Sequence, residues 1–468
     1  MGALRFLVLI IVGGLVVLGV FADQRSRDLD VPVVPTVLGV PNASVGTWFC
    51  PGGSSSTGVA SVGLDLINVG DDDVVVEIIP VRDDVMEVER VEVVAVASAR
   101  TVVNLAELAP EAAWVGAIVE TASADVVVEQ TFDGRSGTDR APCATNTATV
   151  LFGADGATRV LSDGEEMVLL LMNPFRDDAV VDVAFDADTG PDSLEAVVVP
   201  ARRIRAIDVT EEVTVATRVQ ATIEVTAGRL VGHRVQVRNS PALRGLSVTP
   251  LMQRGAVVSV LPSVRSDLGL FDRIHVTNPS PDEVAEVDLE IVTDGSVQLD
   301  PVELTVRPGR TVIVDVATES RLATLGSFGM IVRSLTGVPV AVGVERQVAT
   351  DAEVVSGTAA MVGIDSAARR WAAALDGDQA AIQIVNPSSS AIATVELAVV
   401  GSSGSNQSFE VGPGRFYDVD VAPFGQRAVV VVEASAPVVV GREIVGLTSR
   451  QMTGAVILED PVSVDQVR

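Results

Sequence analysis

The chain has no lysine, so all 33 of its basic residues are arginines. This absence excludes a Schiff-base lysine, the lysine of a phosphate-binding loop and the Lys–Asn isopeptide bonds of some surface adhesins. Histidine is also scarce, since only His233 and His275 occur. A lone histidine in a strand is usually a packed or surface residue, and no serine or cysteine motif accompanies either one. We therefore predict no catalytic residue, no cofactor and no metal site.

Aromatic residues are few as well, at 3% of the chain, whereas hydrophobic residues make up 48%. The core must therefore consist of valine, isoleucine, leucine and alanine. Valine-rich segments of five to nine residues, such as 74–81, 284–292 and 395–400, are bounded by Gly, Pro, Asp or Ser, which is typical of strands. Only residues 104–114 indicate a helical turn or two after the N-terminus. The composition predicts an all-β protein.

An internal repeat is marked by asparagines that end valine-rich strands. The repeat asparagines are Asn68, Asn173, Asn278 and Asn386, which are 105, 105 and 108 positions apart by subtraction. About thirty residues later, each copy has an arginine followed by Asn or Asp: Arg100 and Asn104, Arg203 and Asp208, Arg310 and Asp315, Arg415 and Asp420. Asn before Pro or a polar turn is turn chemistry, so these landmarks are interpreted as structural. The period indicates one small domain copied in tandem.

A unit of this length with about seven short strands matches an immunoglobulin-like β-sandwich. A β-propeller would need a half-length period, which the sequence does not show. We predict four tandem immunoglobulin-like sandwiches after one N-terminal transmembrane helix. The predicted boundaries are an anchor or signal at 1–29, a Pro-rich spacer at 30–45, and repeats at 46–140, 141–248, 249–360 and 361–468.

The N-terminal segment 6–22 is 17 residues long and carries no charge. It is longer than a usual signal-peptide core and at the lower limit for a membrane span. We predict a single-pass membrane anchor with the bulk of the chain extracytoplasmic. The alternative is a secreted protein, cleaved near Ala22, because Val20 and Ala22 offer the small residues that signal peptidase favours.

The chain has two cysteines, Cys50 and Cys143. An isolated pair in an exported chain is more often a disulfide than two thiols, and a metal site would need further ligands. The formal net charge of −29 argues against nucleic acid and anionic lipid surfaces as partners. It permits calcium or a basic partner, but the acidic run at residues 71–73 does not match a calcium loop. We interpret that run as a solvated turn.

Carbohydrate binding usually relies on exposed aromatic faces, and few are available here. The residues that could serve are Trp48, Trp114, Trp371 and Tyr417. Trp48 and Trp371 open the first and fourth repeats, where the second repeat has Leu151 and Phe152. That correspondence favours a role in filling the core.

The segment Trp48-Phe49-Cys50-Pro51-Gly52-Gly53, the later Pro142-Cys143 and the repeated strand-Asn-Pro units are the most specific motifs of the chain. With the single N-terminal span, they resemble the actinobacterial family catalogued as domain of unknown function 5719. The resemblance covers most of the chain from Trp48 onward. It implies an exported or membrane-anchored envelope protein with a disulfide, and it implies no activity.

The sequence thus favours a non-enzymatic envelope scaffold or interaction protein, with the membrane and an envelope protein or glycan as partners. The alternative is a polysaccharide-binding accessory of envelope glycan assembly. A third hypothesis, a hydrolase, requires that His233 and a carboxylate share one pocket.

Overall fold

The computed structural model describes residues 46–467, except for 56–58, 87, 154–155, 159–164, 214, 240–243, 267–269, 296–298, 349–356, 377–378, 402–405, 422–423, 426–427 and 446–449. The described residues all belong to one compact unit, Thr36–Arg468. The predicted span at residues 6–22 and the spacer at residues 30–45 lie outside the described part. Among the described residues, no helix has the length and apolar character needed to span a bilayer.

Nearly every element is a strand, which confirms the all-β prediction. We call the strands β1 to β8 repeat 1 and the strands β9 to β16 repeat 2. Repeat 1 contains β1 (Gly46–Ser54), β2 (Ser61–Asn68), β3 (Val74–Arg82), β4 (Val91–Ala95), β5 (Ala99–Asn104), β6 (Trp114–Thr121), β7 (Val126–Gly134) and β8 (Gly137–Pro142). Repeat 2 contains β9 (Val150–Phe152), β10 (Glu166–Asn173), β11 (Ala179–Ala187), β12 (Gly190–Val199), β13 (Arg203–Asp208), β14 (Val219–Ala227), β15 (Val231–Asn239) and β16 (Arg244–Pro250).

We call the strands β17 to β24 repeat 3 and the strands β25 to β33 repeat 4. Repeat 3 contains β17 (Val258–Arg265), β18 (Leu270–Asn278), β19 (Ala285–Val292), β20 (Val302–Val306), β21 (Arg310–Asp315), β22 (Ser327–Ser334), β23 (Ala341–Val348) and β24 (Gly357–Val362). Repeat 4 contains β25 (Ser366–Ala374), β26 (Gln379–Asn386), β27 (Ala393–Val399), β28 (Gln407–Val411), β29 (Arg415–Asp420), β30 (Val429–Val445), β31 (Arg450–Gly454), β32 (Val456–Ile457) and β33 (Val462–Ser463). Three single-turn helices complete the described elements: α2 (Leu105–Leu108), α3 (Val209–Glu212) and α4 (Val464–Val467).

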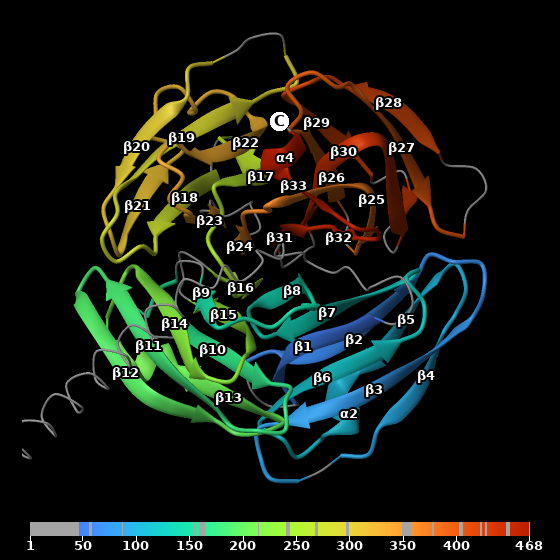
Figure 1. Ribbon diagram of the computed structural model, residues 1–468. Helices are drawn as coiled ribbons and strands as arrows, with labels where there is room; N and C mark the ends of the chain where they lie inside the picture. Colours follow the sequence, from blue (N-terminus) through green and yellow to red (C-terminus); the bar gives the residue numbers. More distant parts are fainter. Residues whose placement is uncertain are drawn as a thin grey trace, which may run out of the picture. The chain divides into compact units, whose positions relative to one another are not determined.

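Strand pairing follows the same order in every repeat. In repeat 3, one sheet runs β17-β22-β19-β20 and the other runs β21-β18-β23-β24. Repeat 2 has the equivalent orders β9-β14-β11-β12 and β13-β10-β15-β16. In repeat 4, the 17-residue strand β30 serves both sheets. Figure 1 shows the two sheets of each repeat lying face to face.

The outer sheets are amphipathic and the inner sheets are not. In β19, Ala285, Val287 and Leu289 point inward and are buried, while the acidic residues between them are more exposed. This alternation is what a half-buried antiparallel strand requires. In β10, by contrast, Leu169 lies in the core of repeat 2 and Leu170 in a core shared with repeat 1. The sheets that contain β2, β10, β18 and β26 are therefore covered on both faces.

The two tryptophans that open repeats 1 and 4 are core residues. Trp48 in β1 and Trp371 in β25 have no exposed surface, as the comparison with Leu151 and Phe152 predicted. The indole of Trp371 donates a hydrogen bond of 3.1 Å to the carbonyl of Ala368. Neither ring is available to stack on a sugar.

Candidate functional site

The repeat asparagines are buried at the ends of β2, β10, β18 and β26, so each predicted strand does end in Asn. In repeat 3, the amide nitrogen of Asn278 donates to the carbonyls of Glu283 (2.7 Å) and Val306 (3.0 Å). Its side-chain oxygen accepts the backbone N–H of Ser280 at 3.0 Å. Asn68, Asn173 and Asn386 make the same three kinds of bond. Each asparagine side chain thus connects the end of its own strand to the loop that follows and to the end of the fourth strand of the repeat.

Replacement of Asn278 by alanine is expected to lower the free energy of unfolding by about 3 kcal/mol, because it leaves buried carbonyl groups without a donor. The matched control is Asn239→Ala, since Asn239 is exposed and accepts only from Arg244 among the contacts found. That control should change the free energy by no more than about 0.5 kcal/mol. Urea unfolding of both variants measures the difference. Equal effects would show that the buried bonds do not stabilise the turn.

The arginine and aspartate landmarks lie at opposite ends of one strand in each repeat. Asp208 and Asp315 end β13 and β21, and each accepts a backbone N–H two residues on. Asp208 thereby caps α3, as Asn104 caps α2. Asp420 ends β29. These residues terminate strands and begin turns.

The arginines at the start of these strands contact the preceding repeat. Arg310 of repeat 3 pairs with Asp186 of repeat 2 at 3.2 Å. Arg415 of repeat 4 donates to the carbonyl of Gly295 in repeat 3. Arg100 of repeat 1 pairs with Asp376 of repeat 4 at 2.7 Å. Charged side chains therefore connect repeat 2 to repeat 3, repeat 3 to repeat 4 and repeat 4 to repeat 1, and Figure 1 shows the four repeats around a shared centre.

A second set of charges is buried between the repeats, on the strands nearest to that centre. We call these residues the central charge cluster: Asp65, Glu129, Arg140, Arg238, Arg265, Asp272, Glu345, Arg346, Asp376, Arg442, Glu443 and Arg450. Most of them have less than a tenth of their side chain exposed. Ionised groups tolerate such burial only when they are paired.

Repeats 4 and 1 meet at one buried part of this cluster. Arg442 forms a two-pronged pair with Glu129, with N–O distances of 2.7 and 3.0 Å, and donates to the carbonyl of Ala374 at 2.7 Å. Arg140 contacts Asp65 and Asp376. Burial alone would lower the pKa of Arg140, but the neighbouring carboxylates raise it above its usual value. The arginine therefore stays charged.

The other junctions repeat this chemistry. Arg346 pairs with Asp272 within repeat 3 at 2.7 Å and with Glu443 of repeat 4 at 2.8 Å. Burial opposes ionisation of Glu443, but Arg346 and its neighbouring arginines lower the pKa of this carboxyl. Arg238 of repeat 2 pairs with Glu345 of repeat 3 at 2.6 Å.

The cluster was not predicted from the sequence. Glu129 lies opposite Asp65, three residues before a repeat asparagine, whereas Glu443 lies opposite Ala381, five residues before the next one. A shift of two residues along a strand keeps the side chain on the same face. The signal in the sequence is therefore a shared strand face rather than an identical distance from the repeat asparagine.

Repeats 1 and 2 meet through neutral side chains and backbone groups. Gln130 lies 3.3 Å from Nδ1 of His233. Asp139 accepts the backbone N–H of Val248 at 2.6 Å. Burial raises the pKa of Asp139 to about 8, against the opposing effect of the two backbone donors. This carboxyl therefore binds a proton far more readily than an exposed one.

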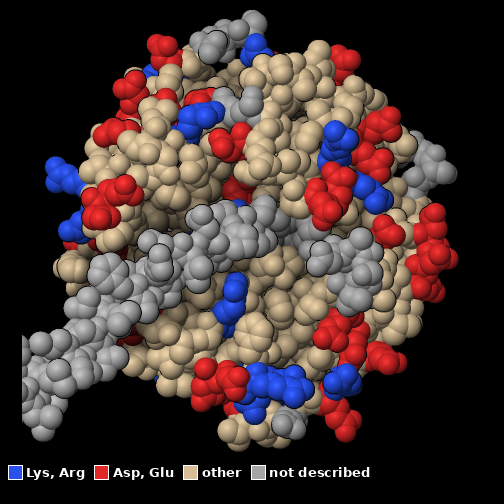
Figure 2. Space-filling model, viewed as in Figure 1, with Lys and Arg blue, Asp and Glu red and all other residues tan. Residues whose placement is uncertain are grey.

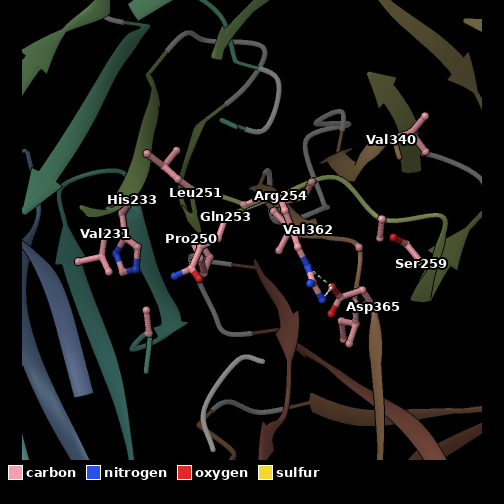
Figure 3. A pocket seen from close by; sticks show the side chains of 16 residues that line it. Val231, His233, Pro250, Leu251, Gln253, Arg254, Ser259, Val340, Val362 and Asp365 are labelled. Atoms are coloured by element: carbon pink, nitrogen blue, oxygen red, sulfur yellow. Dashed lines mark hydrogen bonds and ion pairs between the residues drawn. The ribbon is translucent and has the colours of Figure 1, made fainter. Parts of the chain in front are cut away.

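His233 shares a cavity of about 40 Å³ with Asp365 and Ser259. This is the arrangement that the hydrolase hypothesis required. Arg254, however, binds Asp365 with contacts of 2.9 and 3.3 Å. Figure 3 shows His233 and Ser259 on opposite sides of this pair. A serine nucleophile needs the histidine between it and the carboxylate, so the three residues do not form a catalytic relay.

Burial lowers the pKa of His233 to about 3, while the carbonyl of Pro142 acts weakly in the opposite direction. Below about pH 6.5 the imidazole of His233 therefore binds a proton in the unfolded chain but not in the folded chain. Stability consequently falls as the pH falls. When the pH falls from 7.5 to 5.0, we expect the free energy of unfolding of His233→Gln to decrease by about 2 kcal/mol less than that of the wild type. Urea unfolding at both pH values tests this. Parallel losses in the two proteins would contradict it.

Cys50 and Cys143 form the predicted disulfide, with a Cα–Cα distance of 4.7 Å. Among the described residues, no group of three or more His, Cys, Asp or Glu is arranged to hold a metal ion. Comparison with the models of known protein families finds no match, and no curated protein sequence is significantly similar to this chain.

Proposed function

We propose that this protein is a non-enzymatic scaffold or interaction protein of the cell envelope, built from four tandem immunoglobulin-like sandwiches. The central charge cluster carries the proposal. Its arginines and carboxylates, which could otherwise do chemistry, are buried and paired with one another across the repeat junctions. Paired buried charges specify which surfaces meet, so the repeats would present their loops to a partner in one arrangement.

The sheet order supports the immunoglobulin-like assignment. Each repeat has two facing antiparallel sheets, and the chain crosses from one sheet to the other several times. The disulfide supports an extracytoplasmic location, since such bonds persist in oxidising compartments. The uncharged segment at residues 6–22 supports a single-pass anchor, with cleavage near Ala22 as the alternative. The likeness to the family catalogued as domain of unknown function 5719 points in the same direction.

A pull-down of the tagged full chain from its native envelope in mild detergent tests the scaffold proposal. Amine crosslinkers are nearly useless on a chain without lysine, so a carboxyl-reactive crosslinker suits its 62 acidic residues. We expect a stoichiometric protein partner, identified by mass spectrometry. The matched control is Arg442→Ala, which breaks the junction of repeats 4 and 1 and should weaken recovery. Recovery of glycan alone would contradict the scaffold proposal.

One surface feature favours the alternative, a polysaccharide-binding accessory. Tyr417 is 38% exposed and stacks on Phe409, with ring centroids 4.3 Å apart and an angle of 14° between the rings. Exposed aromatic faces of this kind stack on sugars. Tyr417→Ala should abolish binding of wall oligosaccharides if this alternative holds.

A further inference from the structure

A basic pocket lies where repeat 1 meets repeat 2. Its volume is about 180 Å³, and it is lined by Arg82, Arg90, Arg202 and Arg203 together with Ile79, Pro80, Val81, Met86, Val88 and Ile118. Four arginines around one pocket are unexpected in a chain whose net charge is −29. Figure 2 shows basic side chains gathered at the lower edge of the molecule, where Figure 1 places the ends of β3 and β13.

Two of these four charges are compensated. Arg82 forms a two-pronged pair with Asp84, at 2.8 and 2.6 Å, and Arg90 pairs with Glu77. Among the described carboxylates, none forms an ion pair with Arg202 or Arg203. The guanidinium of Arg203 donates to the carbonyl of Arg202 at 2.9 Å. Arg202 and Arg203 thus lack an ion pair with any described carboxylate, although Arg82 first and Arg203 after it lower the pKa of Asp84.

The equivalent junctions show what is missing here. Arg310 pairs with Asp186 near the end of the third strand of the preceding repeat, and Arg415 donates to the Gly295 carbonyl just after the third strand of its preceding repeat. Arg203 stands in the same place, but the third strand of repeat 1 ends in Arg82, and the two residues are paired through their backbones. Arg82 therefore occupies the position where the other junctions have an acceptor for the arginine. A bound anion would supply the missing acceptor.

Arg202 also has an unusual backbone conformation. Its φ is +52°, in the left-handed region that favours glycine. The equivalent residues, which donate the same backbone N–H bond to the residue two after the repeat asparagine, are Ser98 in repeat 1, with a φ of +48°, Gly309 in repeat 3 and Gly414 in repeat 4. An arginine held in an unfavourable conformation where glycine would be relaxed indicates a requirement for its side chain.

We propose that this pocket binds a phosphate group carried as a dianion, either inorganic phosphate or a phosphate monoester. Guanidinium groups match the oxygen geometry of phosphate with two parallel hydrogen bonds, and two arginines without an ion pair to any described carboxylate match its charge. The pocket exceeds by several-fold the roughly 30 Å³ that a water occupies, so it admits a group of this size. The apolar side chains of Ile79 and Ile118 line it beside the arginines and leave room for an organic substituent.

Isothermal titration calorimetry of the full chain in detergent, at constant ionic strength with chloride as the balancing anion, tests the proposal. We expect saturable binding of inorganic phosphate and of glycerol 3-phosphate at one site. Arg202→Gly should weaken both by at least tenfold while leaving thermal stability in chloride unchanged or higher, because glycine relaxes the turn. Tighter binding of glycerol 3-phosphate would identify a phosphate monoester as the ligand, and equal binding would identify the phosphate group alone.

The matched control is Arg310→Gln, which removes the equivalent arginine of repeat 3 and should bind phosphate as the wild type does. Arg203→Gln is the second test variant and keeps the turn intact. The proposal is overturned if the wild type binds neither probe, or if Arg202→Gly and Arg203→Gln bind as tightly as the wild type.

Discussion

Replacement of Arg442 by alanine is expected to lower the free energy of unfolding by about 3–5 kcal/mol. It leaves the buried carboxylate of Glu129 with only the longer contact of 3.6 Å to Arg140. Arg442 is 1% exposed and Glu129 is fully buried. The change also removes the donor to the Ala374 carbonyl. Repeats 4 and 1 should therefore separate before either of them unfolds. Urea unfolding measures the loss, and hydrogen exchange in β26 and β7 locates it.

The matched control is Arg370→Ala. Arg370 also connects repeat 4 to repeat 1, through Asp125 at 3.5 Å, and it pairs with Glu433 at 3.0 Å. Its side chain is 35% exposed and its partners are more exposed still, so water replaces the lost contacts. Exposed pairs contribute about 1 kcal/mol at most. If both variants lose the same free energy, burial is not what makes the central charge cluster stabilising.

Removal of the disulfide by Cys50→Ala and Cys143→Ala is expected to cost about 4–5 kcal/mol, since the bond closes a loop of 93 residues in the unfolded chain. Both cysteines are fully buried, and next to them Phe49 and Ala144 exchange two backbone hydrogen bonds of 2.7 and 2.9 Å. The double alanine variant keeps these bonds but loses the constraint. Denaturant unfolding followed by tryptophan fluorescence reports on repeat 1 through Trp48.

A reducing buffer provides the control for the disulfide prediction. The wild type unfolded in reductant should match the double alanine variant, and the variant itself should not respond to reductant. An unchanged unfolding midpoint in the double variant would contradict the prediction.

The parts of the fold that depend on local patterns could be predicted from the sequence. Asn278 ends its strand and Arg310 begins the one that pairs with it, as the repeat indicated. His233 lies buried in a strand, and the two cysteines are bonded. These features follow from residues close in sequence, or from a pairing with no competing choice. The membrane anchor at residues 6–22 stays a prediction.

The contacts between repeats could not be predicted in the same way. Glu129 and Arg442 are 313 residues apart, and the position of each in its own strand is compatible with a solvated surface charge. Likewise, nothing in the sequence around Arg82 or Arg203 indicates that the two residues line the same pocket.

The sequence by itself determined the strands, their repeat and the single disulfide, because valine-rich alternation and turn residues act over a few positions. Tertiary structure alone decided that repeats 2 and 3, repeats 3 and 4, and repeats 4 and 1 contact each other through buried arginines. The physical reason is that a buried arginine needs acceptors for its charged group, and those that come from another repeat reach it only when the repeats are packed together.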